Sequence, residues 1–468
     1  MGKWTRRGVL SAGVLGGTGF VIGIAVRPGN PTETAGHLVV GEDENLLHIY
    51  LKIDGDNRAT AILPHSEMGQ GAQTALTQML AEEMDADWNL MRFEEAPANA
   101  EYANMAVGRG YLFKGIDFPD VVVPTVDGLM LNLADALGMQ ITGGSMSIRT
   151  TGQYFLRAAG ASVREMLVKT PSKAWGVPES EIRTAKSMLH HDSSGRLAPY
   201  SEFAAAAAEM TPSSTPKLKK TSQFSIMGHS KPRHDIPSKV DGTAMFAMDV
   251  KRPGMVYAAV KRTPVAGGTL RRVDDNAARA MKGVIDVVKV GPSSAAGLVG
   301  TYSAGDTIAV VADSYWTAEK ALASLKLEWN TEGKERVSSE SIFEQFDRDI
   351  TAGVDRANDV AMGDATAAFD SAATVLTADY RVPYLAHTCM EPPNAIVEVF
   401  ADRAEIWVGC QNPLGFRQHL AANLGLDVQQ VTLHNYFMGG GFGRKSNADY
   451  ALQAAMIARQ VGRPCLLY

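Results

Sequence analysis

Two glycine-rich loops, one near each end of the chain, constrain its fold more than any other feature of the sequence. The first is 67–71 (EMGQG) and the second is 438–445 (MGGGFGRK). Each lies between a run that is typical of a strand and a run that is typical of a helix. The flanking runs are 59–63 and 72–84 for the first loop, and 431–437 and 448–460 for the second.

The position of these loops predicts what they do. Glycine lets the backbone come close to a ligand, and the start of a helix offers unpaired N–H groups that carry positive partial charge. Two such cradles predict a large anionic cofactor that is held from two sides.

The common nucleotide-binding loops do not fit the second loop. A Walker loop needs glycine directly before Lys-Ser, whereas Arg444 precedes Lys445 and Ser446 here. The dinucleotide fingerprint G-x-G-x-x-G also fails, because its last position falls on Arg444 when counted from Gly439 and on Ser446 when counted from Gly441. A nucleoside triphosphate is therefore not the expected ligand.

Charge and cysteine content exclude several classes of function. The 45 basic and 51 acidic residues give a net charge of −6 with no long basic run, which argues against nucleic acid as a partner. The three cysteines, Cys389, Cys410 and Cys465, form no C-x-x-C or C-x-x-C-H motif. The chain is therefore expected to hold no iron–sulfur cluster and no c-type haem.

The N-terminus is typical of a targeting segment. Thr5-Arg6-Arg7 followed by the uncharged stretch 8–26 is similar to a twin-arginine export signal. Those 19 residues would span roughly 28 Å as a helix, close to the thickness of a bilayer core. No clear A-x-A cleavage site follows, so both a cleaved signal and an uncleaved membrane anchor stay open. The expected location is the periplasm, with possible attachment to the inner membrane through this segment.

The rest of the chain predicts an α+β (mixed α/β) fold with several domains. A strand at 45–53 and a turn at 54–57 indicate a hairpin, and 211–220 is a linker by composition. Residues 228–335 are expected to form a separate small α/β unit. The remaining expected helices lie at 153–169, 204–210, 313–325, 337–351 and 415–424. The remaining expected strands lie at 255–261, 284–290, 307–311, 326–329, 374–382, 395–400 and 404–409.

Six stretches of the chain match one family. They are 64–74 (PHSEMGQGAQT), 142–149 (TGGSMSIR), 237–244 (PSKVDGTA), 387–393 (HTCMEPP), 411–413 (QNP) and 438–445. Through them the chain resembles the molybdopterin-binding large subunits of the xanthine oxidase/aldehyde oxidase family. The GQG segment precedes the glycine-rich loop here, an order that is similar to the exported branch of isoquinoline 1-oxidoreductase beta subunits and membrane-bound aldehyde dehydrogenases.

This resemblance implies a division of the chain into four parts. A twin-arginine signal or anchor would occupy 1–35, and a molybdopterin-binding region carrying GQG would occupy 36–225. A domain like the "hammerhead" α/β domain of the family would span 228–335. A second cofactor-binding region carrying GGGFGRK would span 336–468 and would be incomplete at its C-terminus.

The resemblance also implies which residues contact the cofactor. The expected group is molybdenum–molybdopterin, in the cytosine dinucleotide form, with no protein side chain on the metal. The implied contacts are Gly69, Gln70 and Gly71 in the first loop, Gly440, Gly441, Phe442 and Gly443 in the second, Gln411 beside a molybdenum ligand, and Thr142, Ser145 and Ser147 as donors to pterin or phosphate oxygens. Arg444 is expected either to pair with a phosphate or to be a solvated surface residue.

Other polar residues have simpler interpretations. Glu391 is expected to be a structural carboxylate in a turn, because two prolines follow it. His65, His387, His419 and His434 lack metal-ligand spacing and are expected to pack or to form hydrogen bonds.

The family reaction is the oxidative hydroxylation of an aldehyde or an N-heterocycle, with water as the oxygen source. Electrons would leave through a small [2Fe–2S] subunit and then a c-type cytochrome subunit. In relatives the catalytic glutamate lies beyond the equivalent of residue 468, so no catalytic base is expected in this chain. The alternative is an inactive, truncated, exported and membrane-anchored module with at most a role in assembly. The sequence does not distinguish an aldehyde from a heterocycle as substrate.

Overall fold

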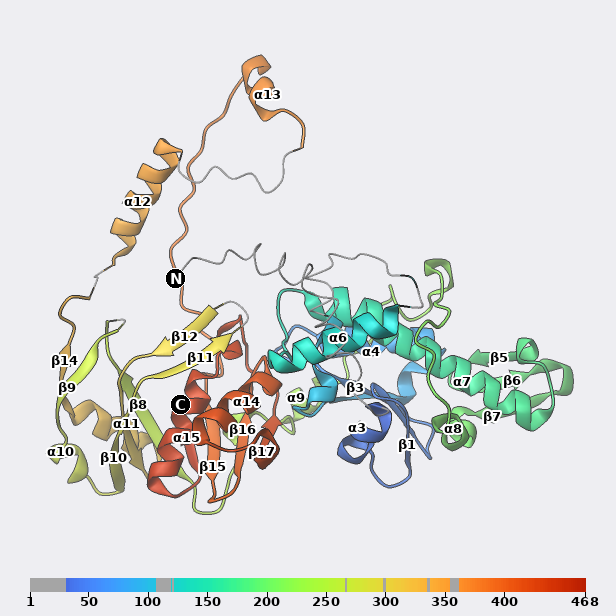
Figure 1. Ribbon diagram of the computed structural model, residues 1–468, viewed down its shortest axis with the longest axis horizontal. Helices are drawn as coiled ribbons and strands as arrows, with labels where there is room; N and C mark the ends of the chain where they lie inside the picture. Colours follow the sequence, from blue (N-terminus) through green and yellow to red (C-terminus); the bar gives the residue numbers. More distant parts are fainter. Residues whose placement is uncertain are drawn as a thin grey trace, which may run out of the picture.

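The computed structural model describes residues 31–106, 119, 122–265, 267–297, 300–334, 337–353 and 362–468. The described chain forms two main regions, which lie side by side in Figure 1. The first contains the elements from α3 (Pro31–Val39) to α9 (Ile236–Asp241), and the second contains β8 (Val256–Arg262) and all later elements. The predicted export signal lies outside the described residues, except for its last positions in α3.

The first region is built on a four-stranded sheet with the order β1-β2-β3-β4. Its strands are β1 (Glu44–His48), β2 (Leu51–Asp54), β3 (Ala59–Leu63) and β4 (Met91–Glu95). The single strand predicted at 45–53 is wrong, because the backbone turns at Ile49 and Tyr50 and β1 folds back antiparallel on β2. The Tyr50 N–H donates to His48 Nδ1 at 3.3 Å within this turn. The predicted hairpin is confirmed as the antiparallel pair β2–β3.

Helices cover this sheet and share its hydrophobic core. They are α4 (Ala72–Glu83), α7 (Arg157–Trp175) and α8 (Tyr200–Ala208), and a π-helical segment, η3 (Ser147–Leu156), leads into α7. The helix predicted at 153–169 is therefore part of a longer helical stretch. At Gly160 the helices α7 and α4 come so close that an added methyl group would meet the Leu80 carbonyl oxygen.

Three further strands and one more helix complete the first region. The strands β5 (Ile182–Ala185), β6 (Met188–His191) and β7 (Arg196–Pro199) form a small antiparallel sheet beyond α7. In Figure 1 this sheet lies at the end of the molecule that is farthest from the second region. Helix α6 (Val123–Ala136) precedes the 142–149 stretch.

The second region is built on a seven-stranded sheet with the order β10-β13-β8-β18-β15-β16-β17. Its other strands are β10 (Val284–Val290), β13 (Thr307–Ala312), β15 (Ala395–Val399), β16 (Ala404–Val408), β17 (Val431–Asn435) and β18 (Cys465–Leu467). Helices lie on both faces, so the alternating residues of β13 enter two different cores. Val311 belongs to the core that α14 (Pro413–Leu424) and α15 (Asp449–Val461) share, whereas Val310 belongs to the core that α10 (Asn276–Arg279) and α11 (Tyr315–Ser324) share.

The short strand β18 joins two parts of the chain that are far apart in sequence. It pairs parallel with β8 on one side and antiparallel with β15 on the other. The regions predicted as 228–335 and 336–468 therefore contribute strands to one continuous sheet. The four-part domain division itself stays a prediction.

In this region one predicted strand is wrong, and one strand of the structure is not predicted. Residues 374–382 form no strand, and Leu376 and Tyr380 are each 91% exposed, because no described element pairs with this segment. The sequence also misses β9 (Thr269–Asp274), which pairs with β14 (Lys326–Asn330). The two helices α12 (Ser339–Ala352) and α13 (Ala365–Ser371) project away from the sheet in Figure 1.

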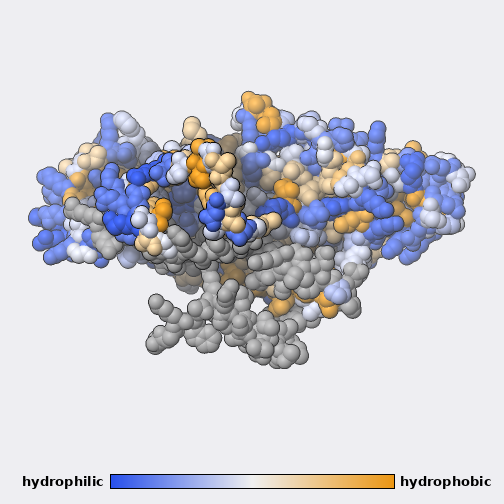
Figure 2. Space-filling model, turned by 90° about the horizontal axis from the view of Figure 1, so that it is seen from above, coloured by the Kyte–Doolittle hydropathy of each residue, from blue (hydrophilic) through white to orange (hydrophobic). Residues whose placement is uncertain are grey.

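The predicted mixed α/β architecture is confirmed by this arrangement of sheets and helices. The coloured part of the face seen in Figure 2 is mainly hydrophilic, with hydrophobic residues lying among the hydrophilic ones. Within the described residues, none of the helices combines the length and the apolar character that are needed to cross a membrane.

Candidate functional site

The first glycine loop connects β3 to α4, as the sequence predicts. Gly69 and Gly71 have φ angles of 99° and 78°, which lie in the left-handed region that favours glycine. Their N–H groups donate to one oxygen of Glu67, at 2.8 Å and 3.0 Å. The Glu67 side chain is only 1% exposed, so a buried carboxylate of the chain itself fills this part of the loop.

Arg233 reaches the same loop from the segment that follows the predicted linker. Its Nη2 forms an ion pair with Glu67 at 3.3 Å, and its Nη1 donates to the Gly69 carbonyl at 3.1 Å. A methyl group added at Gly71 would lie 3.3 Å from Arg233 Nη1. The sequence does not predict this contact, because nothing in the local sequence links position 233 to a loop more than 160 residues away.

The second glycine loop follows β17 and leads through a short turn, η9 (Arg444–Ser446), into α15. At its start the Gly439 N–H donates to Glu391 Oε2 at 2.9 Å, and the Glu391 N–H donates to the Gly439 carbonyl at 3.0 Å. At its end Lys445 Nζ lies 2.6 Å from the same Glu391 oxygen. A second internal carboxylate therefore sits inside this loop, and Glu391 has the structural role that the sequence predicts.

These contacts change the simple interpretation of the loops as anion cradles. The N–H groups of Gly69, Gly71 and Gly439 bind Glu67 and Glu391 rather than standing free for an anionic ligand. Each carboxylate is paired with one cation, Arg233 or Lys445. The loops thus use their amide groups mainly to fix their own shape.

The two loops meet although they lie at opposite ends of the chain. The Met438 N–H donates to the Glu67 carbonyl at 3.1 Å. A methyl group added at Gly441 would lie 2.8 Å from Met68 Sδ and 2.7 Å from Gln411 Oε1. A side chain at residue 441 would therefore have to displace the side chains of Met68 and Gln411.

Gln411 links the second loop to the 142–149 stretch. Its Oε1 accepts from the Gly443 N–H at 3.0 Å, and its Nε2 donates to the Thr142 carbonyl at 2.9 Å. The backbones of Gln411 and Thr142 are also joined, at 2.8 Å, and the Gln411 N–H donates to the Lys445 carbonyl at 2.9 Å. Gln411 is 3% exposed. Three predicted cofactor contacts, Gln411, Thr142 and Gly443, are thus in direct hydrogen-bonding contact.

A buried histidine organises the hydroxyl groups behind this contact. His65 Nδ1 lies 3.3 Å from Thr142 Oγ1 and 3.2 Å from Ser147 Oγ, and its Nε2 lies 2.8 Å from Thr151 Oγ1. Burial lowers the pKa of His65 to about 3, so the ring is neutral near pH 7. The Thr142 hydroxyl also accepts from the Ser66 N–H at 2.9 Å. The prediction that His65 is a hydrogen-bonding residue is confirmed.

The other predicted contacts differ in exposure and partners. Gln70 is exposed, although its amide accepts from the Met68 N–H at 2.7 Å and donates to the Ser66 carbonyl at 3.0 Å. Ser145 and Phe442 are exposed and have positive φ angles of 60° and 51°.

Arg444 lies at the far side of the second loop. Its guanidinium group forms a two-pronged ion pair with Asp449 at 2.7 Å and 2.9 Å. Arg262 binds the same carboxylate at 2.9 Å. The guanidinium group of Arg444 is thus held by an internal carboxylate, and its pairing with a phosphate stays a prediction.

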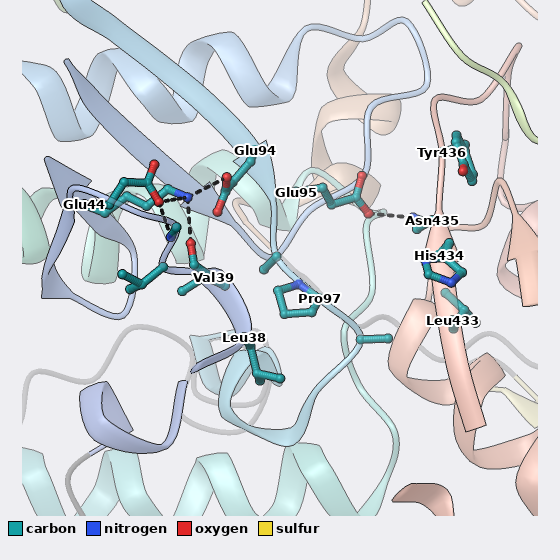
Figure 3. A pocket seen from close by; sticks show the side chains of 15 residues that line it. Leu38, Val39, Glu44, Glu94, Glu95, Pro97, Leu433, His434, Asn435 and Tyr436 are labelled. Carbon is teal, nitrogen blue, oxygen red and sulfur yellow. Dashed lines mark hydrogen bonds and ion pairs between the residues drawn. The ribbon is translucent and has the colours of Figure 1, made fainter. Parts of the chain in front are cut away.

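A cleft of about 670 Å³ lies behind the first loop, between the end of β4 and the free side of β17. Figure 3 shows Glu95 reaching Asn435 across this cleft, while Glu44 and Glu94 lie together on the other side. Glu95 Oε1 accepts from Asn435 Nδ2 at 2.5 Å and from Ser66 Oγ at 2.9 Å. This carboxyl group therefore joins the first loop to the seven-stranded sheet.

Glu95 should make the stability of the protein depend on pH. Burial raises the pKa of its carboxyl group to about 7, against the opposing effect of its hydrogen-bond donors. Since the unfolded chain releases this proton near pH 4.5, the contribution is complete below that pH and is lost as the pH rises through 7. Relative to a Glu95→Gln variant, the wild type should lose roughly 3 kcal/mol of unfolding free energy over this window.

Urea unfolding of both proteins at several pH values measures this difference. The buried histidines His48 and His65 titrate in both proteins, so their effects cancel in the comparison. If the unfolding free energies of the two proteins changed in parallel with pH, Glu95 would not be a neutral, protonated carboxyl group.

Comparison with known families and proteins gives three main findings. Residues 348–468 match the family model of the molybdopterin cofactor-binding domain. The chain is 30% identical to the beta subunit of isoquinoline 1-oxidoreductase of Brevundimonas diminuta, over 89% of this chain and 53% of that protein. It is 28% identical to the membrane-bound aldehyde dehydrogenase (pyrroloquinoline-quinone) of Gluconacetobacter polyoxogenes, over 98% of this chain and 54% of that protein.

A more distant similarity extends to a nicotinate dehydrogenase of Pseudomonas putida. The matching protein of that enzyme is 24% identical over 90% of this chain and 32% of its own length. The chain spans about half of the length of the first two relatives. The matched family model covers the second glycine loop together with Glu391, Gln411 and Lys445.

Proposed function

We propose that this chain, a molybdopterin-binding subunit of the xanthine oxidase family, is the large subunit of an enzyme that oxidises an aldehyde or an N-heterocycle. The observation that carries the proposal is the meeting of the two glycine loops, with Gln411 bonded to both Thr142 and Gly443. Similarity to relatives named for aldehyde and isoquinoline oxidation supports the substrate classes. Nothing in the site favours the alternative of an inactive assembly module.

The residues at the junction of the loops fit a large cofactor that approaches the backbone closely. Gly441 lets the second loop pack against the side chains of Met68 and Gln411, and Gln70 and Phe442 are exposed at the same junction. When bound, molybdenum–molybdopterin would supply the two-electron oxidation chemistry, with water as the oxygen source. The chain would hold it through Gln70, Gln411 and the backbone of 440–443. The exposed Ser145 would serve its polar edge. The buried hydroxyl groups of Thr142 and Ser147, which bond to His65, would support the site from behind rather than contact the cofactor.

The form of the cofactor and the partners are part of the same proposal. Arg233 beside the first loop and Arg444 of the second loop are each held by an internal carboxylate, Asp235 and Asp449, and would share their guanidinium groups with the phosphates of a cytosine dinucleotide. The cysteines of this chain have no spacing for a cluster, so electrons would pass to a small [2Fe–2S] subunit and then to a c-type cytochrome.

Export to the periplasm is proposed from the sequence of the N-terminus. The pair Arg6-Arg7 followed by an apolar stretch supports twin-arginine transport, with possible retention at the inner membrane. Fractionation of cells tests this point, because replacing both arginines with lysine should leave the protein in the cytoplasm.

Metal analysis of the purified chain tests the proposed function. Protein produced with the proposed iron–sulfur partner should contain molybdenum and a pterin. A Gln411→Ala variant should retain roughly 10–100-fold less molybdenum, because it loses the amide that joins Thr142 to Gly443. A Gln418→Ala variant, which loses a hydrogen bond from α14 to the Asp135 carbonyl, serves as the matched control.

The same preparation distinguishes the cofactors that the names of the relatives suggest. Its absorbance spectrum and extracted small molecules should show a pterin and no pyrroloquinoline quinone. Oxidation of aldehydes or N-heterocycles by protein that contains no molybdenum would rule out the proposed function.

A further inference from the structure

One buried ion pair closes the second glycine loop at both of its ends. Glu391 Oε2 accepts from the Gly439 N–H at 2.9 Å and from Lys445 Nζ at 2.6 Å. Glu391 Oε1 accepts from Asn394 Nδ2 at 3.0 Å. The side chains of Lys445 and Glu391 are 1% and 4% exposed. One carboxylate thus holds the first and the last part of the loop together.

Stability alone is a poor explanation for this pair. Moving two charges out of water costs much of what their attraction returns, and apolar side chains of similar volume are often as stable in the same place. The pair does, however, restrict geometry. A methyl group added at Gly439 would lie 2.5 Å from Glu391 Cβ and 3.0 Å from its backbone nitrogen, so the loop and the carboxylate fit each other closely.

The ion pair is also connected, through hydrogen bonds, to Gln411 and Gly443. The carbonyl of Lys445 accepts from the Gln411 N–H at 2.9 Å, and the Gln411 side chain then accepts from the Gly443 N–H at 3.0 Å. The same side chain donates to Thr142. Displacement of Lys445 would therefore move Gln411, and with it the connection between the second loop and the 142–149 stretch.

We propose that Glu391 and Lys445 are positioning residues that hold Gln411 and the 440–443 backbone in the arrangement that receives the cofactor. This inference rests on the proposed function, since it names what keeps the same site in shape. Neither side chain needs to touch the cofactor, because both lie behind the loop. Their effect passes through Gly439, Gln411 and Gly443.

The test compares two buried ion pairs of the same length. A Glu391→Met/Lys445→Met double variant removes the proposed positioning pair without leaving a single buried charge. A Glu83→Met/Arg157→Met double variant removes a buried pair that is also 2.6 Å long but lies between α4 and α7. Both variants are made in the full chain and are compared with the wild type by thermal unfolding, bound molybdenum and hydrogen exchange.

The positioning variant should retain roughly 10–100-fold less molybdenum than the wild type, while the control pair retains a similar amount. Backbone amides of 439–445 should exchange roughly tenfold faster in the positioning variant, in protein without any cofactor, and remain unchanged in the control. Unchanged exchange in this segment would overturn the proposal. Equal losses in the control pair would also overturn it, because they would show general destabilisation.

These readouts separate this inference from the proposed function. If the wild type itself binds no molybdenum, the proposed function fails. The hydrogen-exchange comparison would still decide whether Glu391 and Lys445 hold the loop. If the wild type binds molybdenum and the positioning variant binds as much, only the positioning role fails.

Discussion

A Gly441→Val variant is expected to retain roughly 10–100-fold less molybdenum than the wild type while remaining folded. A methyl group at this position would lie 2.7 Å from Gln411 Oε1 and 2.8 Å from Met68 Sδ. Both atoms belong to flexible side chains that can move aside. The substitution should therefore displace Gln411 and narrow the junction of the two loops, with only a modest change in stability.

A matched control for this prediction is Gly143→Ala. An added methyl group at Gly143 would lie 4.0 Å from the Gln411 amide nitrogen, which is an ordinary contact distance. This variant should bind molybdenum like the wild type. The molybdenum content and the melting temperature of both variants test this prediction. A Gly441→Val protein with its full molybdenum content would show that the junction does not receive the cofactor.

The largest expected loss of stability follows from substitution of Gly160. Helix α7 crosses α4 at this residue, where a methyl group would meet the Leu80 carbonyl oxygen and lie 3.1 Å from Glu83 Cβ. The contact involves backbone, which cannot move aside as a flexible side chain can. A Gly160→Val variant should therefore lose about 3 kcal/mol of unfolding free energy, or fail to accumulate as soluble protein.

Substitution of Gly128 is expected to increase the unfolding free energy instead. Gly128 lies in α6, and an added methyl group there would have no atom within 4 Å. Because alanine favours helix more than glycine does, Gly128→Ala should raise the stability by roughly 0.5–1 kcal/mol. Urea unfolding of the two variants measures both effects. A stable Gly160→Val protein would mean that α4 and α7 do not pack as closely as described.

Much of the fold can be predicted from local patterns in the sequence. The runs 59–63 and 284–290 form strands with the predicted bounds, and the helix predicted at 313–325 is α11, which Ser314 caps. Prediction fails where the structure depends on distant partners. The alternating residues at 374–382 are typical of a strand, but no described element pairs with them. The sequence misses β9 because its two arginines, Arg271 and Arg272, hide the pattern of a strand.

In the candidate site, too, local features are predicted from the sequence and contacts between distant residues are not. The sequence predicts two loops at strand-to-helix junctions, and the structure has both. The sequence does not predict that the carboxylates of Glu67 and Glu391 would accept hydrogen bonds from the N–H groups of those loops. Such contacts join residues that are close only after folding, as Glu391 and Lys445 show across 54 positions.

The central position of β18 has a consequence for the order of events during synthesis. β8 emerges from the ribosome about 200 residues before β18, yet these two strands are parallel neighbours in the sheet. The strands β8 and β15 cannot be joined through Cys465–Leu467 until those residues have been translated. The sheet must therefore close after translation has passed this point, and a chaperone that shields β8 and β15 until then would protect their open edges from aggregation.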